Sequence, residues 1–358
     1  MQTSPQTRTV LAIMAAMCFT ACTETAPPAA SQPDPVPVAE AAEGTQIVIL
    51  DTDLAADLLV PGAGVEKLTG EDFIWSEGPV WIKDGQYLLF TDVPANTMYK
   101  WSEAAGLETF LHPAGLEGDD PEGIIGQPGA NGLIQGDQTG TILLADHGNR
   151  AIARLDLATK KKTFLATDHE GKRFSSPNDL VLADDGSVYF TDPPYGLAGF
   201  MESPHKETAF NGVYRWHPDG RVTLIDDSLT LPNGIILSPD GRTLYVAVSD
   251  PGAAQLFAYD LDTDGEPTSR RMLADMTPLV GGTHPGLPDG LAVDTDGRLY
   301  LAGPGGVHVF MPDGTPVLRI DTGTAAANCT FGDDGRTLYI TSGPWLGRLR
   351  LNALGHGF

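Results

Sequence analysis

The sequence predicts an all-β fold, a six-bladed β-propeller, and three observations support this prediction. One pattern occurs six times, starting with SEGPVW at Ser76–Trp81. It consists of a polar lead residue with an apolar segment, a turn glycine and a second apolar segment. The turn glycines lie 38 to 56 residues apart, which is the period of a propeller blade. The turns between the two apolar segments suit β-hairpins, so each copy supplies at least two antiparallel strands.

The lead residues of the six copies are predicted to face a single opening. In a propeller, the first strand of each blade lies nearest the central channel, so residues at the same position of each first strand meet around it. The six lead residues are Glu77, Asn131, Asn178, Asn233, Asp289 and Asn328. Carboxylate and amide oxygens therefore gather at the entrance of the channel.

The first residues are typical of an export signal. MQTSPQTR carries one positive side chain, and an apolar run of about a dozen residues follows before Cys22, too short to cross a bilayer as a helix. The residues FTAC resemble the lipobox of bacterial lipoproteins, in which the cysteine is lipidated. We expect residues 1–22 to be a signal peptide and the protein to be periplasmic, anchored to the outer membrane through Cys22, with secretion without an anchor as the alternative.

The remaining chain divides into a tether and one domain. Residues 23–45 are rich in Ala and Pro and lack the large apolar side chains needed for a core, so they are expected to be a disordered tether. Residues 46–358 form the propeller, beginning with IVILDTDLAADLLV, whose pattern is compatible with a strand or a short helix. The last repeat supplies only three strands, so the apolar GVEKL at residues 64–68 is expected to complete blade six and close the ring.

Composition and missing motifs exclude several functions. With 22 basic against 47 acidic residues, the chain has a net charge of −25, which disfavours a nucleic-acid partner. The chain contains no GxSxG, HExxH or CxxC motif, no Walker loop and no dinucleotide fingerprint. Serine-hydrolase, zinc-protease and nucleotide-dependent mechanisms therefore lack their characteristic residues.

The predicted ring of oxygens suits a hard divalent cation. Mixed carboxylate and amide ligands match Ca²⁺ and are a poor match for zinc, which prefers histidine and cysteine. A cation would also remove the repulsion between Glu77 and Asp289. For Asn131 and Asn328 the alternative is that the side chain only caps the backbone where its strand begins.

Several motifs together resemble those of a known family. SEGPVW, SPNDL, LPNG, LPDGL and FTDPPYGL are similar to segments of the SMP-30/gluconolactonase/luciferin-regenerating-like (LRE) family, and within it of the bacterial gluconolactonases. The similarity extends from about Val65 to Leu351. It implies that Glu77, Asn233 and Asp289 bind a divalent cation and that Asn178 contacts the metal or the substrate.

The resemblance also implies an activity, the hydrolysis of a sugar lactone to its aldonic acid. The cation, Ca²⁺ or another such as Mn²⁺, Mg²⁺ or Zn²⁺, would polarise the lactone carbonyl. Calcium acidifies water only weakly, so a base is needed, and Asp289 matches the residue proposed in the family. His147 is the second candidate, because an imidazole titrates near neutral pH, with a structural histidine as the alternative.

Further substrate contacts are expected near the opening. Asn131 and Asn178 lie on the ring, and Tyr195 belongs to a long excursion after Asp192 that is expected to cover the opening as a lid. Arg173 lies five residues before Asn178 and could hold a substrate hydroxyl or carboxylate, unless it is a solvated surface arginine. A phosphotriesterase or arylesterase at the same site, or a metal-stabilised binding propeller without catalysis, are the other functions considered.

Overall fold

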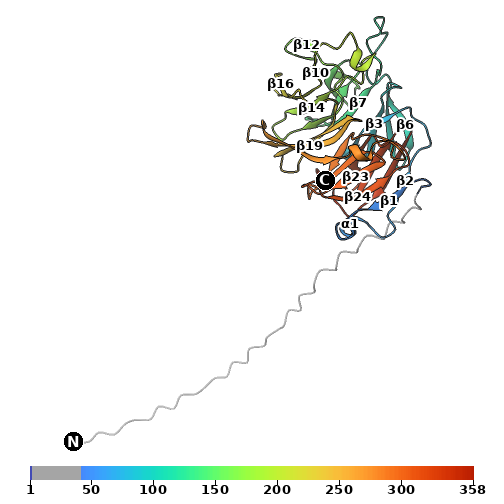
Figure 1. Ribbon diagram of the computed structural model, residues 1–358, viewed down its shortest axis with the longest axis vertical. Helices are drawn as coiled ribbons and strands as arrows, with labels where there is room; N and C mark the ends of the chain where they lie inside the picture. The colour runs from blue at the N-terminus through green and yellow to red at the C-terminus, as the bar shows by residue number, and fades with distance from the viewer. Residues whose placement is uncertain (2–41) are drawn as a thin grey trace. The chain divides into compact units, whose positions relative to one another are not determined.

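The strands form six radially arranged sheets, as the repeats predict (Figure 1). The computed structural model describes Met1 and residues 42–358, so the expected signal peptide, Cys22 and nearly all of the tether at 23–45 lie outside the described residues. The inner strands of the six sheets are β3, β7, β13, β17, β21 and β25. Each contacts the next, and β25 contacts β3, so the ring is closed.

In each of the first three sheets, four antiparallel strands follow one another in chain order, with the first strand at the channel and the last at the rim. Blade one contains β3 (Ser76–Ile82), β4 (Tyr87–Asp92), β5 (Thr97–Ser102) and β6 (Gly106–Leu111). Blade two contains β7 (Ala130–Gln135), β8 (Thr141–Asp146), β9 (Ala151–Asp156) and β10 (Lys162–Ala166). Blade three contains β13 (Leu180–Leu182), β14 (Val188–Asp192), β15 (Gly212–Trp216) and β16 (Val222–Asp226). A short separate hairpin, β11 (Asp168–His169) with β12 (Lys172–Arg173), lies between blades two and three in sequence.

Two of the last three sheets include a strand from the beginning of the domain. Blade four contains β17 (Pro232–Leu237), β18 (Thr243–Asp250), β19 (Ala253–Leu261) and β20 (Pro267–Asp275). Blade five contains β21 (Leu291–Val293), β22 (Leu299–Gly303), β23 (Gly306–Phe310) and β24 (Pro316–Asp321), with β1 (Gln46–Ile49) as a fifth strand at its outer edge. Blade six contains β25 (Asn328–Gly332), β26 (Thr337–Ser342) and β27 (Trp345–Arg350), with β2 (Glu66–Lys67) as its outer strand.

Closure of the ring by an N-terminal strand is confirmed. Glu66 pairs with Arg348 and Lys67 with Gly347, so β2 completes blade six. The segment IVILDTDLAADLLV, which was compatible with a strand or a helix, contains both. The strand β1 is followed by the helix α1 (Thr52–Leu58), which is capped by Asp51. In Figure 1 the blue β1 and β2 lie beside the orange and red strands of the last blades.

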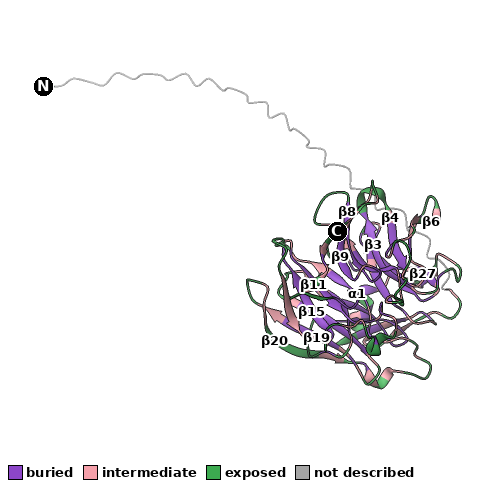
Figure 2. Ribbon diagram, turned by 90° about the horizontal axis from the view of Figure 1, so that it is seen from above, coloured by how far each residue is buried: buried purple, intermediate pink, exposed green. Residues whose placement is uncertain are grey.

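The core consists of apolar layers between neighbouring blades. One cluster joins Val80 and Leu89 of blade one to Leu133 and Ile142 of blade two, and similar clusters fill the other spaces between blades. The seam where the last blade meets the first is aromatic, with Trp81 stacked on Tyr339 at 5.4 Å between ring centroids. Figure 2 shows these strands as buried and the connecting loops as largely exposed. None of the helices within residues 42–358 has the length and apolar character needed to cross a membrane.

Candidate functional site

Small residues after the lead positions bring the inner strands close together. The lead residue is followed by glycine in four blades, at Gly78, Gly132, Gly234 and Gly290. A Cβ atom on Gly78 would lie 2.1 Å from the carbonyl oxygen of Asn131, and one on Gly234 would lie 2.1 Å from that of Asp289. Only glycine fits where one backbone approaches the next this closely, so the lead side chains reach the axis.

Threonines of the second strands tie one blade to the next at the same level. The Thr91 hydroxyl of blade one donates to the carbonyl oxygen of Asn131 in blade two at 3.1 Å. The Thr191 hydroxyl of blade three donates to the carbonyl oxygen of Asn233 in blade four at 2.7 Å. These contacts hold the backbone of the lead residues in register around the channel.

A cavity of about 530 Å³ lies above these lead residues. Of the predicted site residues, it is lined by Glu77, Asn131, Asn178, Tyr195, Asn233 and Asp289. Its other walls come from Trp75, Gln127, Ser249 and Pro251, from a loop at 280–287 that includes His284, and from Ala325. Six residues predicted from sequence therefore meet in one space, although they are spread over more than 200 residues of the chain.

Hydrogen bonds orient the side chains on the floor of the cavity. The Trp75 indole donates to Glu77 Oε1 at 3.2 Å, and the Gly78 amide donates to Glu77 Oε2 at 3.1 Å. On the opposite side, Asn178 Nδ2 donates to Asn233 Oδ1 at 3.1 Å.

The floor carries carboxyl groups whose charge is not balanced by a basic side chain. Burial raises the pKa of Glu77 to about 7. Burial also raises the pKa of Asp289 well above its ordinary value, and the charges of Glu77 and Asp179 raise it further. Within residues 42–358, no lysine, arginine or histidine forms an ion pair with Glu77, Asp179 or Asp289. Unpaired buried carboxylates are costly, so this floor favours binding of a cation.

The donor set fits a hard divalent cation. Glu77 and Asp289 supply carboxylate oxygens, and Asn178 and Asn233 supply amide oxygens, a mixture that calcium accepts. In the part of the chain that the structure describes, no group of three or more His, Cys, Asp or Glu side chains is arranged to hold a metal ion. Amide oxygens would therefore have to complete the coordination, and a site of this composition offers no soft ligands for zinc.

Asp179 is an acid of this layer that the sequence reasoning did not select. Its carboxylate accepts hydrogen bonds from the amides of Leu180 at 2.9 Å and Ile235 at 3.3 Å. Burial, with a contribution from the charge of Glu77, raises its pKa to about 7. The signal was present in SPNDL, where Asp179 occupies the position that is glycine in four other blades.

His147 and Arg173 do not line the cavity. His147 is completely buried, its Nε2 lies 3.4 Å from Asn131 Nδ2, and burial lowers its pKa to about 3. Arg173 lies on the exposed β12, and its guanidinium donates to the carbonyl oxygen of Asn149 at 2.7 Å. His147 lies behind Asn131, and the β11–β12 hairpin holds Arg173 at the surface.

The acids that end the second strands mainly support loops. Asp92 accepts the backbone amide of Ile74 at 2.9 Å, and Asp192 accepts those of Ser175 and Ser176 at 2.9 and 2.8 Å. These carboxylates fix the segments that lead into the inner strands. Ser249, near the end of the second strand of blade four, differs from these acids because it lines the cavity.

The long excursion after Asp192 covers one side of the opening. It pairs with the loop at 112–129, where the amide of Gly126 donates to the carbonyl oxygen of Gly196 and that of Ala198 donates to the carbonyl oxygen of Ile124, both at 2.8 Å. Tyr195 projects from this excursion into the cavity and stacks on Phe200 at 5.4 Å. The loop at 280–287, which leads into blade five, lines the cavity as well. Its proline and glycine content does not indicate that it would line the cavity.

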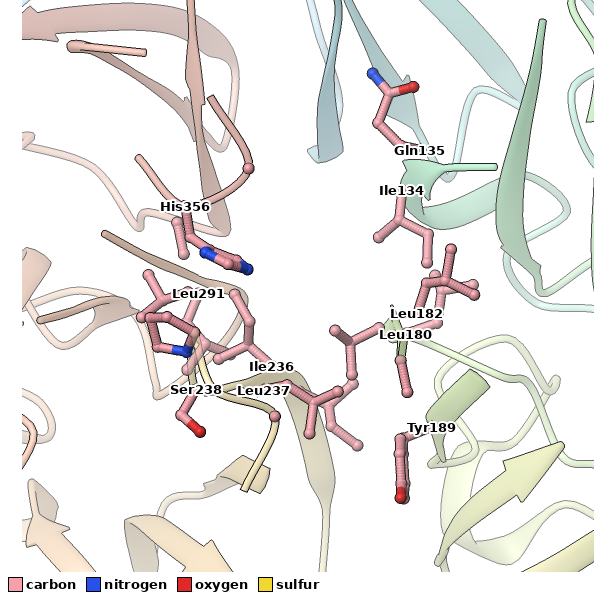
Figure 3. A pocket seen from close by; sticks show the side chains of 18 of the residues that line it. Ile134, Gln135, Leu180, Leu182, Tyr189, Ile236, Leu237, Ser238, Leu291 and His356 are labelled. Atoms are coloured by element: carbon pink, nitrogen blue, oxygen red, sulfur yellow. The ribbon is translucent and has the colours of Figure 1, made fainter. Parts of the chain in front are cut away.

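A second cavity of about 580 Å³ occupies the other end of the channel (Figure 3). Apolar side chains such as Ile134, Leu182 and Ile236 line it, together with His356 from the C-terminal segment. Asp179 and Asn328 also line this cavity. Because this space contains neither Glu77 nor Asp289, the first cavity is the candidate site for chemistry.

Fold and site together define a six-bladed propeller with an acidic, oxygen-lined cavity at one end of its channel. A sequence profile described as the SMP-30/Gluconolactonase/LRE-like region matches residues 75–344. This chain belongs to that family, as its motifs predicted.

Individual relatives are similar along most of their length. A gluconolactonase of Zymomonas mobilis subsp. mobilis is 44% identical over 292 residues, which cover 81% of this chain and 82% of that protein. The solved structure of a gluconolactonase from Xanthomonas campestris has a TM-score of 0.72 at 33% identity and covers 88% of this chain and 97% of its own. Diisopropyl-fluorophosphatase of Loligo vulgaris is 26% identical over 286 residues, covering 76% of this chain and 86% of that protein.

Proposed function

We propose that this protein is a lactone hydrolase that opens a gluconolactone-like sugar lactone to its aldonic acid with the help of a divalent cation. The observation that carries the proposal is the meeting of Glu77, Asn178, Asn233 and Asp289 in one cavity, in a chain 44% identical to a gluconolactonase. The cavity is of a size that suits a small molecule.

The residues of the floor have distinct roles in the proposed reaction. Glu77, Asn178, Asn233 and Asp289 would hold the cation, Ca²⁺ in our proposal, which polarises the lactone carbonyl when bound. Asp289 takes a proton from the attacking water, whose oxygen forms the new bond to the carbonyl carbon. The bond between that carbon and the ring oxygen then breaks, and Asp289 returns its proton to the ring oxygen, which becomes the hydroxyl of the open acid.

The structure favours Asp289 over His147 as the base. Asp289 lines the cavity, so its carboxylate faces the space in which the attacking water would lie. His147 has a lowered pKa and lies outside the cavity lining. We assign it a structural role behind Asn131, which would contact the substrate together with Tyr195.

The test is lactone hydrolysis followed in a pH-stat, with glucono-δ-lactone as substrate. We expect activity to disappear on chelation and to return with Ca²⁺, and Mn²⁺, Mg²⁺ and Zn²⁺ are compared. Asp289→Asn should lower kcat by at least about a hundredfold, in the range of a lost general base. Full activity in chelator would refute the metal role, and a phosphotriester cleaved in preference to the lactone would refute the substrate class.

We also propose that the protein is exported and lipidated at Cys22, on the basis of the first 22 residues. Expression in a bacterial host with labelled palmitate should label the wild type and not Cys22→Ser. Equal absence of label from both would contradict the anchor.

A further inference from the structure

We propose that Ser249 is a positioning residue that sets the amide orientation of Asn233, and through it that of Asn178, toward the bound cation. This inference rests on the metal site of the proposed function. Ser249 lies near the end of β18, is 5% exposed and lines the cavity.

The hydroxyl of Ser249 has only one arrangement that satisfies its neighbours. Its oxygen lies in hydrogen-bond contact with the carbonyl oxygen of Pro288, and a carbonyl oxygen can only accept. The single hydroxyl proton must therefore be donated to Pro288. Toward Asn233 the Ser249 oxygen can then act only as an acceptor.

That constraint decides which end of the Asn233 amide faces Ser249. The amide must present its Nδ2 group to the Ser249 oxygen, and this contact measures 2.9 Å. The two ends of an asparagine amide have nearly the same shape, so its orientation is set by its partners. The Asp289 carboxylate also accepts from the Asn233 amide, and Ser249 adds a second acceptor that favours the same orientation. With Nδ2 held by Ser249, Oδ1 is directed to the opposite edge of the planar amide group.

The same logic extends to Asn178. Asn233 Oδ1 accepts from Asn178 Nδ2 at 3.1 Å, so the nitrogen of Asn178 is engaged by Asn233. The oxygen of Asn178 is therefore at the opposite end of its amide, and no side chain or backbone group of the described residues donates to it. The backbone carbonyl of Pro288 thus acts through Ser249, beside the Asp289 carboxylate, on the orientation of two amides, both of which line the cavity.

The contact also links a third ligand to this network. Pro288 directly precedes Asp289 in the chain, and Asp289 approaches the cavity from the loop that leads into blade five. Ser249 therefore joins the end of β18 to the segment carrying Asp289 and to β17, which carries Asn233. Partners of this kind, which hold metal ligands from outside the coordination sphere, commonly change metal affinity by 10- to 100-fold when removed.

The test measures cation binding rather than turnover. The full-length protein is stripped with chelator and titrated with Ca²⁺ in a calorimeter and with Tb³⁺ by luminescence, for which Trp75 in the cavity wall is the nearby sensitiser. We expect Ser249→Ala to weaken Ca²⁺ affinity by about tenfold or more. Ser175→Ala is the matched control, because Ser175 is also a buried serine but its hydroxyl has no hydrogen-bond partner among the described residues. It should change the affinity by less than about twofold.

A second background separates orientation of the amide from tethering of the loop. In Asn233→Asp, both ends of the side chain are oxygens, so no orientation needs to be selected. Adding Ser249→Ala to this variant should cost less than about twofold in Ca²⁺ affinity. An equal loss in both backgrounds would show that Ser249 acts only by holding Pro288 and would overturn the proposal. So would an unchanged affinity in Ser249→Ala alone.

Failure of this inference is distinguishable from failure of the proposed function. If Ser249→Ala weakens Ca²⁺ binding while the wild type opens no lactone, the positioning role stands and the lactonase proposal fails. If the wild type opens lactones but binds neither Ca²⁺ nor Tb³⁺, the positioning role is refuted.

Discussion

Replacing Glu77 by glutamine should have opposite effects on stability with and without a cation. In chelator at alkaline pH, the wild type holds a buried carboxylate that no basic side chain neutralises. The Glu77→Gln protein has no charge at that place and should be more stable. Under the proposed metal role the order should reverse in excess Ca²⁺, because the cation would stabilise the wild type more than the variant, which lacks one carboxylate ligand.

The expected size follows from the pKa of Glu77. Burial raises it from 4.5 to about 7, and at 1.36 kcal/mol for each pH unit this corresponds to roughly 3 kcal/mol. The two carboxylate oxygens accept separately from Trp75 and from Gly78, whereas a glutamine amide has only one oxygen. Losing one of these hydrogen bonds costs about 1 kcal/mol, so a net gain of about 2 kcal/mol is expected.

The pH dependence has a definite sign. Between pH 4.5 and about 7, Glu77 is still protonated in the folded protein but ionised in the unfolded chain. The folded state therefore binds more protons in this window, and wild-type stability falls as pH rises through it. The advantage of Glu77→Gln should be absent near pH 4.5, grow through the window and level off above pH 7.

Urea unfolding followed by tryptophan fluorescence measures these differences. The experiment compares the wild type with Glu77→Gln at the two ends of the pH window, in chelator and in excess Ca²⁺. Glu117→Gln, at an exposed position, is the control for removing one negative charge from an acidic protein. The reasoning is refuted if Glu77→Gln is no more stable than the wild type in alkaline chelator, or if its advantage is the same at both pH values.

Three further predictions follow from the fold and the cavity. Gly234→Ala should lower the Ca²⁺ affinity and should lower the free energy of unfolding by about 3 kcal/mol or more, because its Cβ would lie 2.1 Å from the Asp289 carbonyl oxygen. Calorimetry measures the affinity and urea unfolding the stability, and an affinity equal to that of the wild type would contradict the close packing. Arg173→Ala should leave kcat/KM for the lactone within about twofold, because the side chain bonds to Asn149 at the surface, and a tenfold loss would place it in substrate binding. Deleting residues 42–70 removes β2 and the buried Leu58 and Val65, so the free energy of unfolding should fall by about 5 kcal/mol or more. An unchanged midpoint of urea unfolding would contradict closure of the ring by β2.

The repeat pattern was sufficient to predict the fold because a blade is a local structure. Each copy carries its own strands and turn, and its apolar faces can be buried only by stacking against further copies. The count of six, the inner position of the lead strands and the missing outer strand of blade six could all be read from spacing. Glu77, Asn178, Asn233 and Asp289 were found for the same reason, since they occupy equivalent positions in a repeat.

The tertiary structure decided what the repeat does not encode. Arg173 lies five residues before Asn178 and His147 directly follows β8, yet a hairpin holds Arg173 outward and His147 is buried behind Asn131. Asp179 and Ser249 act through contacts with other blades, and the loop at 280–287 reaches the cavity only because the ring closes. The sequence by itself determined which residues stand at the head of each inner strand, because that position is set by local periodicity. Only the folded ring decided which loops, amides and backbone carbonyls surround them, because those neighbours come from distant parts of the chain.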